Sequence, residues 1–333
     1  MAIAEFALIE RYFKQGQNSG THAAVLGIGD DAAIVDIPIG QQLCVAVDTL
    51  VAGVHFPEHT PAYDIAYKAL AVNLSDMAAM GATPRWFTLA LTLPTADERW
   101  IKNFSEGLFA LAQTCSVELI GGDTTCGPLC ISIQIMGLLP RNQALLRSGA
   151  QIGDDIYVSG TIGDAGLGLR LEQLTVAPAP SATLDILLTR LNRPTPRLQL
   201  GQALLTLAHA AIDVSDGLLV DLQHVLTSSQ RGARVNLDAI PLSDAYRTLS
   251  PAQDKHRQVI NALEAGDDYE LCFTAPPQNR TALAALSERL SLPLTRIGEV
   301  TQQAVLHCVD QEGKILAYQP RGFEHFTNSG ACT

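Results

Sequence analysis

Strand-like and helix-like patterns alternate along the first half of the chain, and this alternation limits the folds it can adopt. Apolar runs of strand length occupy residues 42–50, 85–93, 117–122 and 129–139. Apolar side chains recur at helical spacing over residues 61–82, and residues 96–115 form a second amphipathic pattern. We therefore expect an α/β (α+β) domain of roughly 140 residues.

A second domain is expected to follow, because the pattern loosens at residues 140–150 and then restarts. A new strand is predicted at residues 156–160, helices after Gly163 and Gly217, and a strand at 270–275. We assign residues 1–145 to an N-terminal domain and residues 146–333 to a C-terminal α/β domain. The 333 residues, 47% of them hydrophobic, are enough for two cores.

The charge balance excludes several classes of protein. A net charge of -12 argues against a nucleic-acid surface and against binding to an anionic membrane, since both need basic patches. The N-terminal segment carries Glu5 and Glu10 in an amphipathic pattern, so it lacks the basic start and apolar run of a signal peptide. No apolar run is long enough to span a membrane. We expect a cytoplasmic protein.

The seven cysteines are scattered and include no CxxC pair. This distribution is typical of reduced thiols in the cytosol. Cys126 and Cys130 lie close together, but no second pair or histidine cluster completes a zinc site.

The stretch GIGDDAAIV, residues 27–35, places Asp30 and Asp31 directly behind a glycine turn. Its glycines resemble a degenerate dinucleotide fingerprint, but the apolar residues that follow predict a strand and not the required helix. Two carboxylates would also repel a bare pyrophosphate. A phosphate bound here would therefore need cations, and the simpler alternative is a surface turn.

Other aspartates also stand beside glycines or at the ends of predicted elements: Asp48, Asp76, Asp123, Asp213, Asp216, Asp267 and Asp268. Mg²⁺ prefers such hard oxygen ligands and shares them with phosphates and water. For any one of them a turn or cap role is the simpler interpretation. Asp76 differs, because it lies at the edge of an apolar helix face where an unpaired charge is costly. No phosphate-loop or protein-kinase motif occurs, so phosphate chemistry would use metals, backbone amides and chiefly Arg147.

A set of ordered segments resembles the thiamine-monophosphate kinase family of the aminoimidazole ribonucleotide synthetase-like superfamily. The segments are GIGDDAA, DTLVAGVHF, YKALAVNLSDMAAMGA, LIGGDTT, RSGAQIGDDIYVSG, AIDVSDGL, DDYELCF and GFEHF. They cover nearly the whole chain, to about Phe326. The resemblance implies two α/β domains, with N-domain strands forming the barrel of a homodimer. It also implies that ATP phosphorylates thiamine monophosphate to thiamine diphosphate, with ADP as the other product.

The resemblance also assigns site residues. Several Mg²⁺ ions would be held by Asp30, Asp31, Asp48, Asp76, Asp123, Asp213 and Asp216. ATP would contact Gly122, Asp123, Arg147 and Ser215. Thiamine monophosphate would contact His55, Asp267 and Phe323. We expect direct in-line transfer without a catalytic base, because the acceptor phosphate is already ionised at neutral pH.

The chain departs from the family pattern at two places. Ala46 and Val47 stand before Asp48 where relatives tend to have serine or threonine, so a metal contact there would need backbone carbonyls or water. Ala265, Gly266 and Asp267 stand where relatives have Gly-Gly-Glu, which shortens the acceptor contact by about one methylene. For His55 and Phe323 a packed core position is the alternative.

Other functions in the same superfamily stay open at this point. A selenophosphate synthetase would need a reactive cysteine in a glycine-rich N-terminal segment, and no cysteine precedes Cys44. A hydrogenase-maturation dehydratase ends in a reactive cysteine, and Cys332 is penultimate here. A catalytically inactive metal-binding homologue is the alternative from another class, and it would tolerate loss of Arg147.

Overall fold

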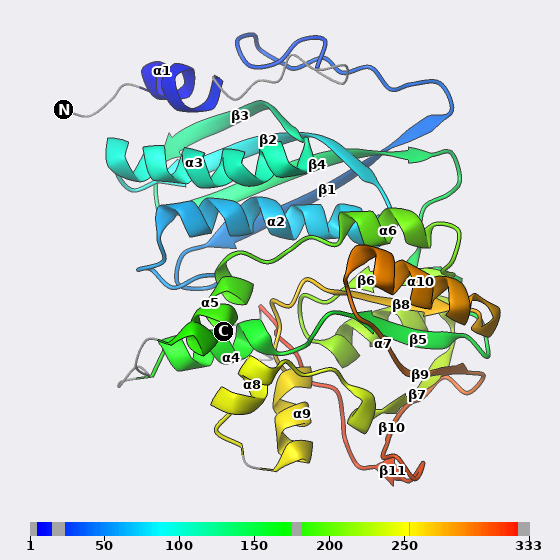
Figure 1. Cartoon of the computed structure of the whole chain (residues 1–333). Helices are drawn as coiled ribbons and strands as arrows, with labels where there is room; N and C mark the ends of the chain where they lie inside the picture. Colours follow the sequence, from blue (N-terminus) through cyan, green and yellow to red (C-terminus); the bar gives the residue numbers. More distant parts are fainter. Residues whose placement is uncertain (1–4, 15–23, 175–180, 253, 326–333) are drawn as a thin grey trace. The chain divides into compact units, whose positions relative to one another are not determined.

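The computed structural model describes residues 5–14, 24–174, 181–252 and 254–325 (Figure 1). The chain divides into two compact units. Unit 1 comprises residues 1–77 and 82–143, and unit 2 comprises residues 78–81 and 144–333.

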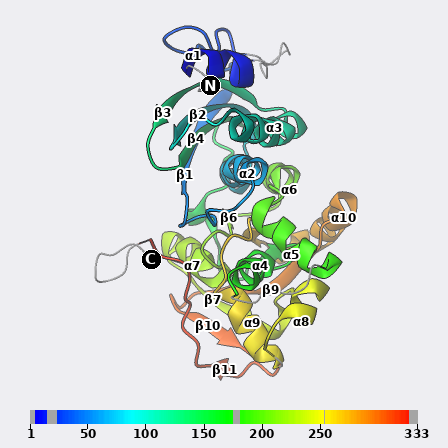
Figure 2. The same cartoon turned by 90° about the vertical axis from the view of Figure 1, so that its left-hand side faces the viewer.

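Unit 1 is a four-stranded sheet covered on one face by two helices (Figure 2). Its elements are α1 (Glu5–Leu8), the π-helical turn η1 (Ile9–Phe13), β1 (Gln41–Val51), α2 (Ala62–Met80), β2 (Thr83–Leu93), α3 (Glu98–Cys115), β3 (Glu118–Cys126) and β4 (Cys130–Pro140). The strand order is β1-β4-β2-β3, in which only β2 and β3 run parallel. β1 is therefore an edge strand of the sheet, paired with β4 along its whole length.

Helix α3 shows how local sequence sets these elements. Asp97 caps its start, because the carboxylate accepts hydrogen bonds from the amides of Arg99 and Trp100. Gly107 lets α3 approach α2 closely, since a Cβ at this position would lie 2.1 Å from the carbonyl oxygen of Tyr63.

One predicted strand does not form. The residues after the glycine turn were expected to be a strand, but they make only an isolated bridge, in which Leu26 and Ile34 exchange two backbone hydrogen bonds. Ile37 and Ile39 beyond it are exposed. The prediction was wrong because apolar, β-branched composition makes a strand only where a neighbouring strand is available.

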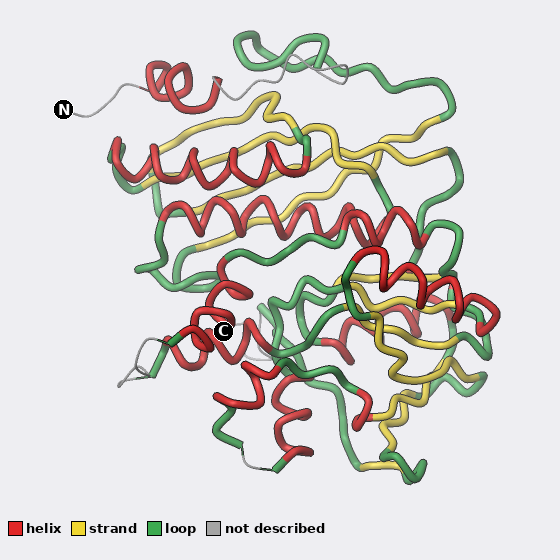
Figure 3. Tube along the Cα trace, in the orientation of Figure 1, coloured by secondary structure: helices red, strands yellow, loops and turns green. Residues whose placement is uncertain are grey.

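Unit 2 is built on a seven-stranded mixed sheet of order β11-β10-β7-β9-β5-β8-β6 (Figure 3). The strands are β5 (Asp155–Ser159), β6 (Ala210–Asp213), β7 (Gly232–Asn236), β8 (Leu271–Ala275), β9 (Leu294–Thr301), β10 (Leu306–Val309) and β11 (Ile315–Leu316). The helices are α4 (Asp164–Glu172), α5 (Ala182–Asn192), α6 (Leu198–Leu204), α7 (Leu218–Ser229), α8 (Asp244–Leu249), α9 (Lys255–Leu263) and α10 (Arg280–Leu290). Single 3₁₀ turns are η3 (Arg147–Gly149), η4 (Leu237–Ala239) and η5 (Pro277–Asn279).

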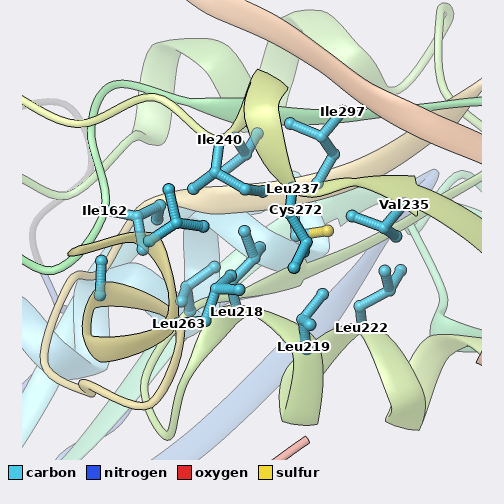
Figure 4. Packing of buried hydrophobic residues seen from close by; sticks show 14 of the residues in the cluster. Ile162, Leu218, Leu219, Leu222, Val235, Leu237, Ile240, Leu263, Cys272 and Ile297 are labelled. Atoms are coloured by element: carbon cyan, nitrogen blue, oxygen red, sulfur yellow. The ribbon is translucent and has the colours of Figure 1, made fainter. Parts of the chain in front are cut away.

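The main core of unit 2 fixes helix α7 to the sheet. Leu218, Leu219 and Leu222 of α7 are fully buried and belong to the same cluster as Val235 of β7 and Cys272 of β8 (Figure 4). Burying such side chains contributes about 1.5–3 kcal/mol each. The position of α7 matters because the loop before it carries several predicted site residues.

None of the helices in the described ranges is long and apolar enough to cross a membrane.

Candidate functional site

In unit 1, three predicted metal ligands line one cavity of about 810 Å³. Asp30 and Asp31 come from the glycine turn, and Asp123 comes from β3. The backbone amide of Asp31 donates a hydrogen bond to Oδ1 of Asp30 over 2.9 Å. Gly122 also lines the cavity, and no larger residue fits there because a Cβ would lie 2.0 Å from the carbonyl oxygen of Leu89.

Asp48 and Asp76 lie on facing elements of unit 1. The amide of Asp48 on β1 donates a hydrogen bond to Oδ1 of Asn73 on α2, over 3.2 Å. Burial raises the pKa of the Cys44 thiol on β1, and the charge of Asp76 on α2 adds to the rise. Because Cys44 and Asp48 alternate with residues of the other face, both lie on the side of β1 that faces α2.

His55 is held by the turn that follows β1. Its Nδ1 accepts a hydrogen bond of 3.0 Å from the amide of Val51, and its carbonyl oxygen accepts one from Lys68. In the neutral ring the proton is therefore assigned to Nε2. The side chain is half-buried, whereas the next residue, Phe56, belongs to the core.

In unit 2, the loop between β6 and α7 carries Ser215 and Asp216. Three consecutive amides, those of Ser215, Asp216 and Gly217, donate hydrogen bonds to Oδ2 of Asp221, over 3.0, 3.1 and 3.2 Å. Asp213, the last residue of β6, is buried at the start of the same loop. Burial raises the pKa of Asp221 to about 7, and the charges of Asp216 and Asp213 act in the same direction.

Two distant segments are hydrogen-bonded to this loop. The amide of Asp267 donates to the carbonyl oxygen of Ser215 over 2.8 Å, and the amide of Phe323 donates to that of Asp216 over 3.1 Å. Phe323 is 39% exposed and lies edge-on to the ring of His325, so it is not a core residue.

The charges that shift the pKa of Asp216 show which other groups lie near it. Burial is the main cause that raises the pKa of its carboxyl. The charges of His224, His325 and Arg147 lower it, and that of Asp267 raises it again. Unit 2 therefore gathers Arg147, Asp216 and Asp267 within electrostatic range of one another.

The segment that carries Asp267 has an unusual backbone. Asp267 and Tyr269 adopt left-handed conformations with φ of 65° and 50°. The hydroxyl of Tyr269 donates a hydrogen bond of 3.0 Å to Oδ1 of Asp267. Such strain persists only where the surroundings fix the chain, and it is concentrated at functional sites.

Arg147 is anchored through its main chain. The hydroxyl of Ser229, the last residue of α7, donates a hydrogen bond of 2.8 Å to the carbonyl oxygen of Arg147. The same hydroxyl accepts one from the amide of Ala150 over 3.1 Å. The Arg147 side chain itself is exposed.

Comparison with known proteins places this arrangement in a family. Residues 29–139 match the N-terminal domain of AIR synthase related protein, and residues 151–310 match its C-terminal domain. The thiamine-monophosphate kinase of Escherichia coli K12 is 48% identical over 98% of this chain and 99% of its own length. The chain belongs to the thiamine-monophosphate kinase family. The Haemophilus influenzae member of this family is 44% identical over 99% of the chain and the whole of the relative.

Solved structures of thiamine-monophosphate kinases agree with this assignment. The Stenotrophomonas maltophilia K279a enzyme superposes with a TM-score of 0.85 at 51% identity, covering 95% of this chain and 99% of that one. The complex of AaThiL with AMPPCP and TMP gives a TM-score of 0.75 at 27% identity, covering 97% of both chains. The two-domain α/β fold expected from the sequence is therefore confirmed.

Hydrogenase-maturation proteins, the alternative raised by the sequence, share only the fold with this chain. HypE in complex with ATP superposes with a TM-score of 0.73 at 20% identity, over 96% of both chains. Cys332, the residue that raised this alternative, lies outside the described residues. The full-length similarity to thiamine-monophosphate kinases favours that family.

The donor chemistry fits the Mg²⁺ that the thiamine-monophosphate kinase resemblance implies. No three histidine, cysteine, aspartate or glutamate side chains in the described ranges form a group arranged to hold a metal ion. Asp30, Asp31 and Asp123 instead line an open cavity. Carboxylates around a cavity suit an ion that also binds water and phosphate oxygens, as Mg²⁺ does.

Two residues that support the candidate site, Asp221 and Glu270, were not identified from the sequence. Asp221 binds the Ser215 loop, and the buried Glu270 accepts hydrogen bonds from Arg190, Arg197 and Ser159 beside the Asp267 segment. Local sequence gave a signal only for Asp221, which is acidic in the first turn of a helix. The partners of Glu270 lie more than 70 positions away in the chain, so no local pattern reveals them.

Proposed function

We propose that the chain catalyses the ATP-dependent phosphorylation of thiamine monophosphate to thiamine diphosphate, in the biosynthesis of that cofactor. The observation that carries this proposal is the 48% identity to the Escherichia coli thiamine-monophosphate kinase along almost the entire length of both proteins. A related structure, AaThiL, binds AMPPCP and TMP. The loop of unit 2 that gathers Arg147, Asp216 and Asp267 is consistent with a site for phosphates and a cationic acceptor.

We assign the roles of the residues as follows. Mg²⁺ would be held by Asp30, Asp31, Asp48, Asp76, Asp123, Asp213 and Asp216, and it would neutralise the phosphates that have to meet. ATP is assigned to Gly122, Asp123, Arg147 and Ser215. Thiamine monophosphate is assigned to His55, Asp267 and Phe323.

The chemistry requires positioning more than proton transfer. The acceptor is a phosphate oxygen that is ionised at neutral pH, so it attacks without a general base. Arg147 binds the negatively charged donor phosphates. Phe323 and Asp267 contact the positively charged, aromatic thiazolium ring of the acceptor, through the face of the phenyl ring and through a carboxylate. Transfer is direct and in line, with no covalent intermediate on the protein.

A homodimer in the cytoplasm completes the proposal. Leu43, Val45 and Val47 project from one face of the edge strand β1 and are 42%, 48% and 64% exposed. An apolar edge strand of this kind is usually covered by another chain. The six cysteines of the described ranges are all unpaired, as expected in a reducing compartment.

The test is turnover with Mg²⁺ removed and restored. The purified chain, ATP and thiamine monophosphate should give thiamine diphosphate and ADP in equal amounts with Mg²⁺, and neither product after chelation. Re-addition of Mg²⁺ should restore both. Consumption of ATP without thiamine diphosphate would reject the kinase activity, and the absence of any turnover together with intact ATP binding would support an inactive homologue.

A further inference from the structure

The loop of residues 215–217 presents three consecutive amides to a single carboxylate oxygen. Ser215, Asp216 and Gly217 each donate a hydrogen bond to Oδ2 of Asp221, within 3.2 Å. Successive amides that converge in this way form a concave anion site, and here the chain fills that site with its own side chain. When the Asp221 carboxyl is ionised, each of these bonds is charge-assisted and is stronger than a bond between neutral groups.

The remaining backbone groups of the loop are also satisfied. The amide of Val214 donates to the carbonyl oxygen of Glu270 over 2.8 Å. The four carbonyl oxygens of residues 214–217 accept hydrogen bonds of 2.8–3.1 Å from the amides of Tyr269, Asp267, Phe323 and Asp221, in that order. The main chain of the loop is thus fixed on both sides. We therefore expect the side chains of Ser215 and Asp216 to be the groups of this loop that meet a ligand.

The contacts of Asp221 exceed what a helix start requires. An acidic residue in the first turn of a helix can cap it by accepting a hydrogen bond from the amide just before the helix. In α7 this amide is that of Gly217, so capping explains only one of the three bonds. The amides of Ser215 and Asp216 lie outside α7, in the loop itself. Asp221 is 2% exposed, and Leu218, Leu219 and Leu222 fix α7 in the core, so the carboxylate is a rigid reference point for the loop.

We propose that Asp221 is a positioning residue for the reaction: it holds the loop so that Ser215 and Asp216 face the triphosphate and its metal ions. The proposal rests on the proposed function and extends it to a residue that does not touch substrate. Side chains that orient metal ligands typically contribute about 10- to 100-fold to affinity or activity.

The direct test is binding of the Mg²⁺ complex of AMPPCP to the full-length chain by titration calorimetry. Asp221→Ala should weaken binding about tenfold or more, because three amides lose their acceptor. Asp221→Asn keeps an oxygen at the same place and should weaken binding by only about threefold. With ATP as substrate, the KM for ATP should rise by the same factors.

A second readout covers the case in which Asp221→Ala does not fold. In Asp221→Asn, hydrogen exchange of the amides of residues 215–217 should be faster than in the wild type, because a neutral oxygen binds them less tightly. Unchanged exchange at these amides would overturn the proposal. So would binding of Asp221→Ala within twofold of the wild type.

A matched control separates positioning from general stability. Asp155 is another buried carboxylate of unit 2, and it pairs with Arg280 and Arg296 outside the proposed site. Asp155→Asn should lower the unfolding temperature and leave the affinity for AMPPCP unchanged. Equal weakening in both variants would overturn the proposal. A wild-type chain that binds AMPPCP and forms no thiamine diphosphate would refute the proposed function, while the titration would still decide the role of Asp221.

Discussion

At the scale of single residues, Asp267 combines a strained backbone with a proposed contact to the acceptor. Its φ of 65° lies in the left-handed region, which aspartate and asparagine adopt more readily than other residues with a Cβ. Its carboxylate also accepts the hydroxyl of Tyr269, which fixes its direction.

Asp267→Asn should raise the KM for thiamine monophosphate about tenfold, because it removes a negative charge from the site of a cationic ring and retains the left-handed backbone. Steady-state kinetics with each substrate varied in turn will measure this. The KM for ATP should change less than twofold; a larger change in the KM for ATP than for thiamine monophosphate would contradict the assignment.

Asp123 tests the role assigned to the cavity of unit 1. Asp123→Asn should lower kcat at least about 100-fold, because one charged ligand near the phosphates is lost. The Mg²⁺ concentration needed for half-maximal rate should also increase. Asp36 is an exposed carboxylate in the segment after the glycine turn. The variant Asp36→Asn is therefore the control, and it should leave both quantities unchanged.

At the scale of elements, helix α7 holds two proposed ATP contacts from its two ends. Asp221 near its start binds the Ser215 loop, and the hydroxyl of Ser229 at its end bonds the carbonyl oxygen of Arg147 and the amide of Ala150. Because a buried apolar face fixes this helix, it can keep the Ser215 loop and the Arg147 segment at constant positions relative to each other. This arrangement predicts that changes at the end of α7 affect ATP binding.

Ser229→Ala removes two hydrogen bonds, each of which contributes about 1 kcal/mol to the stability of the segment that carries Arg147. The KM for ATP should rise about threefold, because Arg147 is then held less firmly. Thr227→Ala removes a hydroxyl from an exposed position of the same helix and is the matched control. Titration with AMPPCP compares the two variants. Equal affinities in the two would show that the Ser229 contacts do not orient Arg147.

The pairing of β5 with α10 and β9 predicts a pH-dependent stability. Burial alone would raise the pKa of Asp155, but hydrogen bonds and charges from Arg280 and Arg296 outweigh it and hold the pKa below its usual value. The Arg280 contacts measure 2.6 and 2.8 Å. A lowered pKa in the folded state stabilises the protein fully above the unfolded pKa of about 3.9, and this contribution is lost as the pH falls through the folded value.

Denaturant unfolding should therefore show the wild type about 2 kcal/mol more stable than Asp155→Asn at pH 7. The difference should shrink as the pH falls below about 4, because the wild-type carboxyl becomes protonated. Both proteins share all other titrating groups, so their difference isolates Asp155. A difference that is constant down to pH 3 would contradict the pairing.

At the scale of the whole molecule, the exposed apolar face of β1 predicts self-association. Val47→Glu should convert a dimer into a monomer, because a buried charge without a partner in the interface costs several kcal/mol. Sedimentation velocity at micromolar concentration measures the mass. Ile186→Glu, at an exposed apolar position of α5, is the control and should remain dimeric. A monomeric wild type would refute the dimer.

Sequence patterns predicted helices and strands well where the residues of one segment are enough to determine its structure. The helical spacing of Tyr63, Leu70 and Met77 predicted a helix over residues 61–82, and α2 spans Ala62–Met80. The glycines and aspartates of the turns also marked Asp30 and Asp123 as candidate metal ligands, and both line one cavity of unit 1, although their role as ligands stays a prediction.

Features that depend on distant partners could not be predicted in this way. The apolar stretch after Asp31 has strand composition, but it forms only the bridge between Leu26 and Ile34. Glu270 gives no local signal, since its arginine partners come from α5 and from the segment before α6. The resemblance to a family supplied the site assignments for this reason.

The proposed function requires that this chain transfers the γ-phosphate of ATP directly to thiamine monophosphate. The most direct measurement is incubation of the chain with γ-³²P-labelled ATP, thiamine monophosphate and Mg²⁺, followed by separation of the products. The label should appear in thiamine diphosphate, with one ADP formed for each labelled molecule. Label found in inorganic phosphate, or retained on the protein after its removal from substrates, would contradict it.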